Sequence, residues 1–248
     1  VNSQWLSSNT PIMSDSFKNL MPVNTSELNT RYVTIGNTKF IADKGRKIKI
    51  SNNSYYSYPP DTNSYNLIND TLPSSTPADF LLHDNTNNSS WLVNKGQKIS
   101  VDFAQQLTLG FLSNNLMNAG VSSDFISSIP TNSADNFSLL IKKEGSGGIK
   151  FLNFGSALGF PDSSTLINAT DNTINKVLVV DDLTYDRYPV VGSITRVLKD
   201  DNGNLYLLEA GKKRWITNWN AYLPYKNIPI TYLYGTTLVQ IPTGTNIN

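Results

Sequence analysis

Short runs of alternating hydrophobic and polar positions recur along the chain, and three of them share one pattern. Each opens on an aromatic residue, reaches a glycine five positions later and then alternates basic and apolar residues; they are FIADKGRKIKIS at 40–51, WLVNKGQKISVD at 91–102 and YLLEAGKKRWIT at 206–217. Alternation with a period of two predicts half-buried strands, and a glycine between two such runs favours a tight turn. We therefore predict three β-hairpins, with turns at Gly45, Gly96 and Gly211.

Alignment of the three runs on their glycines places residues of similar character in the same columns. The first column is aromatic and the second apolar; a polar residue precedes the turn, a lysine follows it, and an apolar residue closes the second strand. In that order the columns are Phe40, Trp91 and Tyr206; Ile41, Leu92 and Leu207; Asp43, Asn94 and Glu209; Lys47, Lys98 and Lys213; Ile50, Val101 and Ile216. A weaker fourth copy, LLIKKEGSGGIKF at 139–151, aligns on Gly145 and lacks the lysine.

The segments that follow the hairpins also recur. A helical turn that ends at glycine or proline and an aromatic residue is predicted at AQQLTLGF (104–111), GSALGF (155–160) and NAYLPY (220–225), and FISSIPT (125–131) corresponds to LVQIPTG (238–244). The four glycines lie 51, 49 and 66 positions apart, and we assign the extra length of the last interval to an insertion around VLVVDDLTYDRYP (177–189). Periods of this length are typical of repeat arrays, in which one unit cannot bury its apolar face alone.

The two ends of the chain suggest how the units are arranged. QWLSSNTPIMSDSFKNLM, near the start, is similar to RWITNWNAYLPY, the second half of a unit, and the chain stops at IPTGTNIN, where a new unit would begin. Terminal half-units that complete each other are typical of closed rings. We predict an all-β fold, a repeat-built β-propeller of about five small blades; the alternatives are an open array of β-hairpin modules and a two-sheet β-sandwich. Residues 1–248 form a single domain, with approximate units 1–37 (half), 38–77, 78–133, 134–190 and 191–248.

Composition agrees with short strands joined by polar loops. Asn, Ser and Thr supply about a third of the 248 residues, which works against long helices, while the apolar fraction of 39% suffices for a core. The absence of cysteine excludes disulfides and thiolate metal sites. No apolar run approaches the ~20 residues that a membrane-spanning helix needs. A net charge of +1 gives no reason to expect nucleic-acid binding.

Catalytic chemistry finds little support in the sequence. His83 is the single histidine, and no GxSxG motif accompanies it. A glycoside hydrolase needs two carboxylates across one sugar bond, and the acidic residues available for such a pair are Asp181, Asp182, Asp186 and Glu209. KDDNGN (199–204) reads as a hairpin turn, with a cation held by Asp200 and Asn202 as the alternative. We expect a protein that is not an enzyme and has no cofactor and no metal site.

The most distinctive surface chemistry is aromatic and basic. Aromatic rings stack on the apolar faces of sugars while amide and hydroxyl groups bond the sugar hydroxyls, and Asn, Thr and Tyr residues are plentiful here. Trp215 shares a column with Lys49 and Ser100, which points outwards if Ile216 points inwards. The alternative is that these aromatic residues pack between units. The predicted ligand-binding residues are Trp215, Trp219, Arg214, Tyr222, Trp91 and Lys213.

The succession YLLEAGKKRWIT, NAYLPY and LVQIPTG resembles a hairpin repeat of secreted bacterial and phage surface proteins, and in diluted form the resemblance covers 40–247. It implies a lectin-like, cell-wall or carbohydrate-binding role. We therefore expect a non-catalytic extracellular module at a cell or virion surface, which binds a glycan or, through basic hairpin tips, an anionic surface polymer, with a role in adhesion or host attachment. The alternative is a structural subunit that packs against other proteins of a virion, pilus or surface layer. A hydrolase ranks below both, and neither nucleic-acid binding nor membrane insertion is expected.

Overall fold

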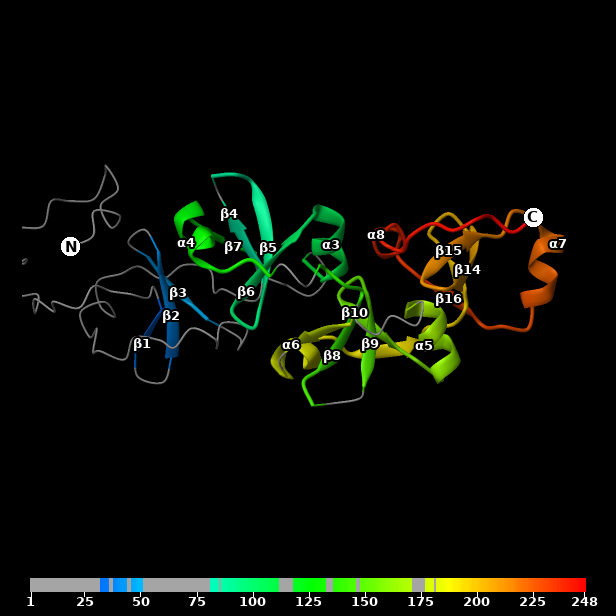
Figure 1. Ribbon diagram of the computed structural model, residues 1–248, viewed down its shortest axis with the longest axis horizontal. Helices are drawn as coiled ribbons and strands as arrows, with labels where there is room; N and C mark the ends of the chain where they lie inside the picture. The colour runs from blue at the N-terminus through cyan, green and yellow to red at the C-terminus, as the bar shows by residue number, and fades with distance from the viewer. Residues whose placement is uncertain are drawn as a thin grey trace, which may run out of the picture.

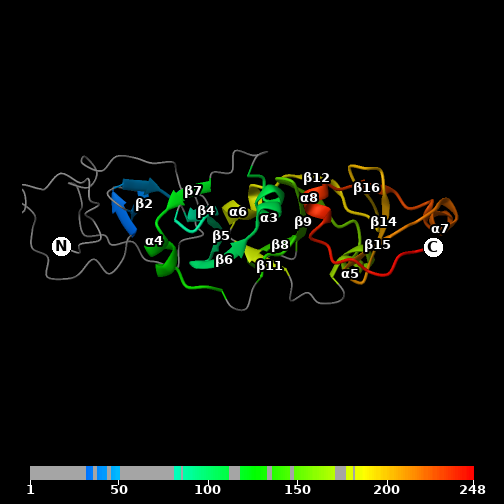
Figure 2. The same ribbon diagram turned by 90° about the horizontal axis from the view of Figure 1, so that it is seen from above.

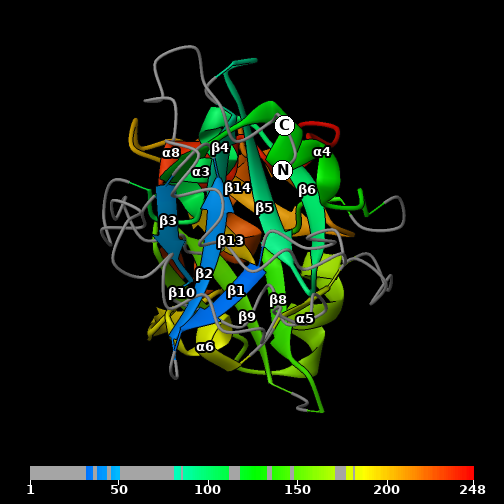
Figure 3. The ribbon, with the colours of Figure 1, turned by 90° about the vertical axis from the view of Figure 1, so that its left-hand side faces the viewer.

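The computed structural model describes residues 32–35, 38–43, 46–50, 81–84, 86–111, 118–132, 136–145, 148–170, 177–180 and 182–248. Within them the chain forms four separate open sheets that follow one another along the long axis of the molecule (Figures 1 and 2). We call the parts of the chain that carry these sheets the first module (32–50), the second (81–132), the third (140–193) and the fourth (197–248). Viewed along the long axis, the sheets lie behind one another (Figure 3).

The strands and helices have the following bounds. The first module contains β1 (Tyr32–Ile35), β2 (Thr38–Asp43) and β3 (Arg46–Lys49). The second contains β4 (Leu81–Asp84), β5 (Ser89–Asn94), β6 (Gln97–Val101), α3 (Phe103–Thr108), β7 (Asn118–Val121) and α4 (Ser123–Ser128). The third contains β8 (Leu140–Lys143), β9 (Ile149–Asn153), β10 (Ser156–Gly159), α5 (Ser163–Thr170), β11 (Leu178–Val180), α6 (Asp182–Asp186) and β12 (Val190–Ser193). The fourth contains β13 (Val197–Lys199), β14 (Leu205–Glu209), β15 (Lys212–Trp215), α7 (Trp219–Tyr222), η3 (Leu223–Tyr225), β16 (Ile230–Tyr232) and α8 (Gly235–Leu238).

The last three modules share one topology. Three antiparallel strands are followed by a helix, a strand that returns parallel to the first strand, a second short helix and a proline segment. The proline carbonyl accepts a hydrogen bond from the third strand in each case: Pro130 from Lys98, Pro189 from Ala157 and Pro242 from Lys213, at 2.8, 2.9 and 2.8 Å. The correspondence between FISSIPT and LVQIPTG is therefore a structural equivalence.

The structure confirms the predicted hairpins at Gly96 and Gly211 and corrects the anchor of the fourth copy. Gly96 and Gly211 have φ of 73° and 67°, and the residue before each also has positive φ, the two-residue turn that matches strand twist. Gly45 lies outside the described residues, although Asp43 and Arg46 pair on either side of it. In the third module the equivalent glycine is Gly155, with φ of 77°, and not Gly145, which belongs to the preceding β8–β9 turn.

This correction removes two further predictions. GSALGF is not a helical turn, because it carries the turn glycine and β10. The segment around 177–189 is not an insertion, because it supplies β11, α6 and the proline segment that the second and fourth modules also possess. The fourth copy was misaligned because both hairpins of the third module start with apolar residues and turn at a glycine.

The β-propeller is wrong, since the four sheets are open and succeed one another in a row. The C-terminal residues do not complete a unit elsewhere: Thr243 and Ile247 bridge to Lys213 and Ile216 within the fourth module. The half-unit predicted at the start of the chain lies largely outside the described residues. Each module covers one face of the next module's sheet, and apolar residues of both modules are buried between them. This burial stabilises the row.

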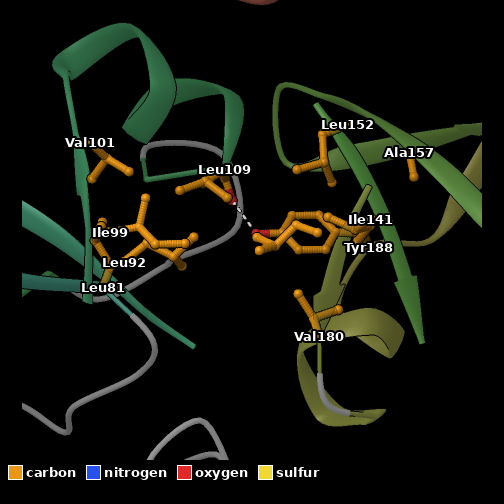
Figure 4. Close-up of a cluster of buried hydrophobic side chains, with 11 residues drawn as sticks. Leu81, Leu92, Ile99, Val101, Leu109, Ile141, Leu152, Ala157, Val180 and Tyr188 are labelled. Atoms are coloured by element: carbon orange, nitrogen blue, oxygen red, sulfur yellow. Dashed lines mark hydrogen bonds between the residues drawn. The ribbon is translucent and has the colours of Figure 1, made fainter. Parts of the chain in front are cut away.

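The interface between the second and third modules shows this packing (Figure 4). Apolar residues from one face of the second module meet apolar residues from the opposite face of the third, and the Tyr188 hydroxyl donates to the Leu109 carbonyl across the interface at 3.0 Å. The same columns form the other two interfaces. One column consists of Ile48, Ile99 and Leu158, three residues after the turn glycine, which are buried against the following module in each case.

An asparagine two residues before the turn glycine links neighbouring modules. Asn94 Nδ2 donates to the Val179 carbonyl of the third module at 2.9 Å, and Asn153 Nδ2 donates to the Tyr232 carbonyl of the fourth at 3.4 Å. Val179 and Tyr232 occupy equivalent places in their parallel strands. The polar column before the turn therefore connects one module to the next.

Contacts also reach past the nearest neighbour. Helix α3 of the second module packs on α8 of the fourth (Figures 1 and 2), and Gln240 Nε2 donates to the Ala104 carbonyl and to Thr108 Oγ1. The Gly155 N–H of the third module donates to the Thr108 carbonyl at 2.9 Å. Because stacked repeats ordinarily touch only their neighbours, this brace joins the last three modules into one packed body.

Candidate functional site

Two lysines of the column predicted at the hairpins, Lys98 and Lys213, point inwards to backbone carbonyls of their own modules. Lys213 Nζ donates to the carbonyls of Leu238 and Ile241 at the end of α8, at 2.6 and 2.9 Å, and Lys98 Nζ donates to the Ile126 carbonyl of α4 at 2.6 Å. Burial lowers the pKa of both lysines. A positively charged donor at a helix C-terminus satisfies carbonyls that have no helical partner. These lysines therefore bind α4 to the sheet of the second module and α8 to the sheet of the fourth.

The third module places its lysine on the adjacent strand. Ala157 occupies the column of Lys98 and Lys213, and Lys150 of β9, on the same face, donates to the Tyr185 and Tyr188 carbonyls at 2.8 Å each. Burial lowers the pKa of Lys150. The sequence alignment missed this lysine because it was anchored on Gly145; with Gly155 as the anchor the column holds Ala157, and the equivalent contact is made by Lys150 from the neighbouring strand.

Three other predicted ligand-binding residues have structural partners. Trp91 is half-buried, donates from Nε1 to Ser89 Oγ at 3.0 Å and has Lys98 Nζ 5.1 Å from its ring centroid. Tyr222 is buried among the apolar residues of the fourth module. The guanidinium of Arg214 pairs with Glu209, which also pairs with Arg196 at 3.2 Å.

Arg214 stands in the column of Ile48, Ile99 and Leu158, the column that packs on a following module. Glu209 stands in the column of Asn94 and Asn153. The outer face of the fourth module thus carries an ion-paired cluster where inner modules carry module-to-module contacts, and α7, Tyr225 and Ile247 cover its apolar residues from within the same module.

The two remaining predicted residues are exposed. Trp215 is 42% exposed and points away from the buried Ile216, as its column indicates, and Trp219, at the start of α7, is 67% exposed. Trp219 contacts Tyr222 with ring centroids 5.3 Å apart. The structure places these rings on the surface of the fourth module, whereas Trp91, in the second module, belongs to another part of the row.

An aromatic cluster that the sequence analysis missed lies where three modules meet. Tyr234 stacks on Phe154 with ring centroids 4.6 Å apart, and Tyr232 meets Tyr234 edge to face at 5.5 Å. Phe154 lies in the β9–β10 turn of the third module, next to the Gly155 N–H that contacts α3 of the second, and both tyrosines belong to the fourth module. We call Phe154, Tyr232, Tyr234 and the neighbouring Asp201 the junction cluster.

Hydrogen bonds hold the junction cluster in place. The Tyr232 hydroxyl donates to Asp201, and the second oxygen of that carboxylate accepts from the Gly235 N–H at 2.9 Å. Asn153 Oδ1 accepts from the Tyr234 N–H at 3.2 Å. The backbones that carry the two tyrosines are therefore fixed from both modules.

Strand β16 and the two residues after it present the tyrosines on an exposed face. In ITYLY (230–234), alternation places Ile230, Tyr232 and Tyr234 on one face and Thr231 and Leu233 on the other. The structure exposes these three at 47%, 47% and 41% and buries Thr231 and Leu233 instead. The equivalent positions of Tyr232 in the second and third modules are Gly120 and Val179, so the module fold itself does not require aromatic residues here.

The hydroxyl of Tyr232 offers a direct test of this geometry. Its hydrogen bond to Asp201 raises the pKa of Tyr232 from 10.0 to about 12. In an Asp201→Asn variant we expect this pKa to fall towards the usual value, because the carboxylate that opposes ionisation is gone. An alkaline titration followed by NMR of ring-labelled tyrosine measures the shift, with Asp124→Asn in α4 as the control. An unchanged Tyr232 titration would contradict the contact.

Among the described residues, His83, Asp182 and Glu209 lie in three different modules, each with its own partners, and the fourth candidate carboxylate, Asp181, lies outside the described residues. His83 Nδ1 lies 3.2 Å from Ser90 Oγ. The carboxylate of the neighbouring Asp84 accepts hydrogen bonds from the Ser123 hydroxyl and from the Thr86 N–H. Asp182 pairs with Lys143 at 3.0 Å in the third module, and Glu209 pairs with arginines in the fourth. Among the described residues no group of three or more His, Asp and Glu side chains is placed to hold a metal ion.

Asp84 and Asp200 occupy equivalent positions at the end of the first strand of their modules. Burial by itself raises the pKa of both, but hydrogen bonds from Ser123, Thr86 and Asn87 to Asp84 outweigh it, so its pKa lies below 3.8. Asp200 likewise accepts from Asn202 and Asn204 and from the Tyr206 hydroxyl, which lowers its pKa. The oxygens of Asp200 are used by this turn, which argues against a cation shared with Asn202.

These carboxylates predict loss of stability in acid. Because their folded-state pKa values lie below the unfolded value, their contribution is complete above about pH 4 and is lost as the pH falls through the folded pKa. We expect an Asp84→Asn, Asp200→Asn variant to have a lower Tm at neutral pH and a flatter fall of Tm in acid than the wild type. Calorimetry between neutral pH and pH ~2 measures Tm as a function of pH, with Asp124→Asn as the exposed control. If Tm fell equally steeply in acid for the variant and the wild type, the assignment of these two carboxylates would be contradicted.

Comparison with known proteins adds little to this site. No family model matches the chain, and no curated protein matches it. Among solved structures, it is similar to a chain of the periplasmic assembly from the ESX-5 inner membrane complex, at 10% identity over 93% of this chain and 96% of that one, with a TM-score of 0.21. It is also similar to a chain of an intact ESX-5 inner membrane complex, at 10% identity over 94% and 82%, with a TM-score of 0.22. At such TM-scores neither likeness carries an argument about fold or function.

None of the helices in the described ranges is long and apolar enough to cross a membrane.

Proposed function

We propose that this protein is a non-catalytic extracellular module that binds glycan at a cell or virion surface, with the junction cluster as its binding site. The observation that carries the proposal is the outward-facing set of Ile230, Tyr232 and Tyr234, at a place where the second and third modules have no aromatic residue. Adjacent exposed apolar and aromatic side chains, unlike single scattered ones, are typical of interaction surfaces. Aromatic residues provide an apolar platform with a polar edge, which suits the two kinds of surface on a sugar.

The position of the cluster supports the same proposal. Binding sites occur preferentially at interfaces between domains, where side chains from separate elements converge. Here Phe154 comes from the third module and both tyrosines from the fourth, and the α3–α8 brace holds the second module against them. A rigid platform loses little conformational entropy when a ligand binds.

The experiment is a glycan-array screen followed by titration of any hit. We expect a Tyr232→Ala, Tyr234→Ala variant to lose about tenfold in affinity or more, since each stacked ring contributes about 1 kcal/mol. Trp219→Ala, which removes an exposed ring at the other end of the fourth module, serves as the matched control and should bind normally. Loss of binding in the Trp219 variant alone would move the site to α7.

A role as a structural subunit is the second candidate, and a different observation favours it. The α3–α8 brace turns three modules into one packed body, as a spacer in a surface assembly requires. The same screen separates the two: no glycan bound at millimolar concentration refutes the binding proposal and leaves the spacer.

A further inference from the structure

We infer that the ligand of the junction cluster is an uncharged saccharide and not an anionic surface polymer; this inference rests on the proposed function. The argument comes from where the positive charges of the described modules lie and from the charge of the cluster itself.

The lysines that would make the hairpins attractive to a polyanion are turned inwards. The ammonium groups of Lys98, Lys150 and Lys213 donate hydrogen bonds to backbone carbonyls at helix ends. A buried ammonium that already has carbonyl partners cannot also neutralise a phosphate at the surface without breaking those bonds. The surface of these hairpins therefore carries fewer available positive charges than their sequences contain.

Several of the remaining cations have acidic partners. Lys95 pairs with Glu144 and Lys143 with Asp182, each at 3.0 Å, and Arg196 and Arg214 share Glu209. Among the described residues, the exposed lysines outside these pairs include Lys39 and Lys49 in the first sheet and Lys199, Lys212 and Lys226 in the fourth module. The first sheet and the fourth module stand at opposite ends of the row (Figure 1). Charges separated by more than ~8 Å in physiological salt act almost independently, so the lysines of these two modules do not form one continuous basic surface for a polyanion.

The junction cluster itself carries balanced charge. Lys199 pairs in register with Tyr232 on the neighbouring strand, and Asp201 contributes one carboxylate beside them. A carboxylate has about four acceptor positions, and two of those on Asp201 accept from Tyr232 and Gly235. The remaining positions suit sugar hydroxyl donors, and because Asp201 offsets the charge of Lys199, the cluster has no net positive charge to attract phosphate, sulfate or uronate groups.

The test compares neutral oligosaccharides, such as N-acetylglucosamine and β-glucan oligomers, with poly(glycerol phosphate), by calorimetric titration at low and high NaCl. We expect binding to a neutral oligosaccharide with an affinity that salt leaves unchanged within about twofold, and no binding to poly(glycerol phosphate). An affinity for poly(glycerol phosphate) that falls with salt would overturn the inference and leave a surface-binding function standing. Binding of neither probe would refute the proposed function together with the inference.

A single substitution sharpens the contrast. Asp201→Asn removes the carboxylate, and we expect the affinity for the neutral oligosaccharide to fall about three- to tenfold, because a charge-assisted hydrogen bond becomes a neutral one. For an anionic ligand the same change removes a repulsion and would strengthen binding. The direction of the change therefore decides between the two ligand classes. Asp186→Asn in α6 is the matched control, and Tm values of all variants show that the fold is kept.

Discussion

Ile99→Arg is expected to cost about 4 kcal/mol or more of folding free energy and to separate the second module from the third. Ile99 is 4% exposed and lies in the apolar interface of Figure 4. An arginine there would bury an unpaired charge and remove the packing of the aliphatic side chain, the two changes with the largest effects on stability. Urea unfolding measures the loss, and limited proteolysis between the modules reports their separation.

The matched control lies in the same column of the fourth module. Arg214→Leu replaces a half-exposed, ion-paired arginine with the kind of residue that the column carries elsewhere, and we expect a change within about 1 kcal/mol. Equal destabilisation by the two substitutions would mean that the column does not carry the contacts between modules. A large loss of stability at Ile99 and a small change at Arg214 would show that this column carries contacts between modules inside the row but not on the outer face of the fourth module.

Lys213→Met is expected to destabilise the fourth module by about 2–4 kcal/mol. The substitution keeps much of the aliphatic stem but leaves the Leu238 and Ile241 carbonyls without their charged donor. An unsatisfied buried carbonyl costs about 1–3 kcal/mol, and hydrogen bonds to charged groups are worth more than neutral ones. Thermal and urea unfolding measure the effect, and hydrogen exchange at α8 shows whether the helix detaches from the sheet.

Lys212→Met provides the control, because Lys212 is exposed and adjacent in the chain. We expect it to leave the free energy of unfolding within about 0.5 kcal/mol. If both substitutions had the same small effect, Lys213 would not be a structural lysine, and its assignment as a surface cation would have to be restored.

The sequence alone determined the hairpin and much of the module. Register in a hairpin follows from local alternation and from a turn glycine that tolerates positive φ, so the columns that contain Leu92 and Leu207 are buried as aligned. The equivalence of the two proline segments was likewise readable, because Ile-Pro-Thr occurs at the same place in two modules. The short second helices and the parallel return strands were not predicted, since elements of three to six residues leave too little periodicity, although Ser122 is a recognisable cap for α4.

Tertiary structure alone decided how the modules are joined and where the surface lies. A sheet with apolar residues on both faces can be covered in a ring or in a row, and local alternation is the same in both, so the propeller could not be excluded from the pattern. The direction of Lys98 and Lys213 depends on helix ends 28 and 25 residues away in the chain. The junction cluster joins Phe154 to Tyr234 and Tyr232 across a module boundary, and the face that carries the two tyrosines is the exposed one. Periodicity says which residues share a face of a strand, but only the neighbour that covers a face decides which of the two is inside.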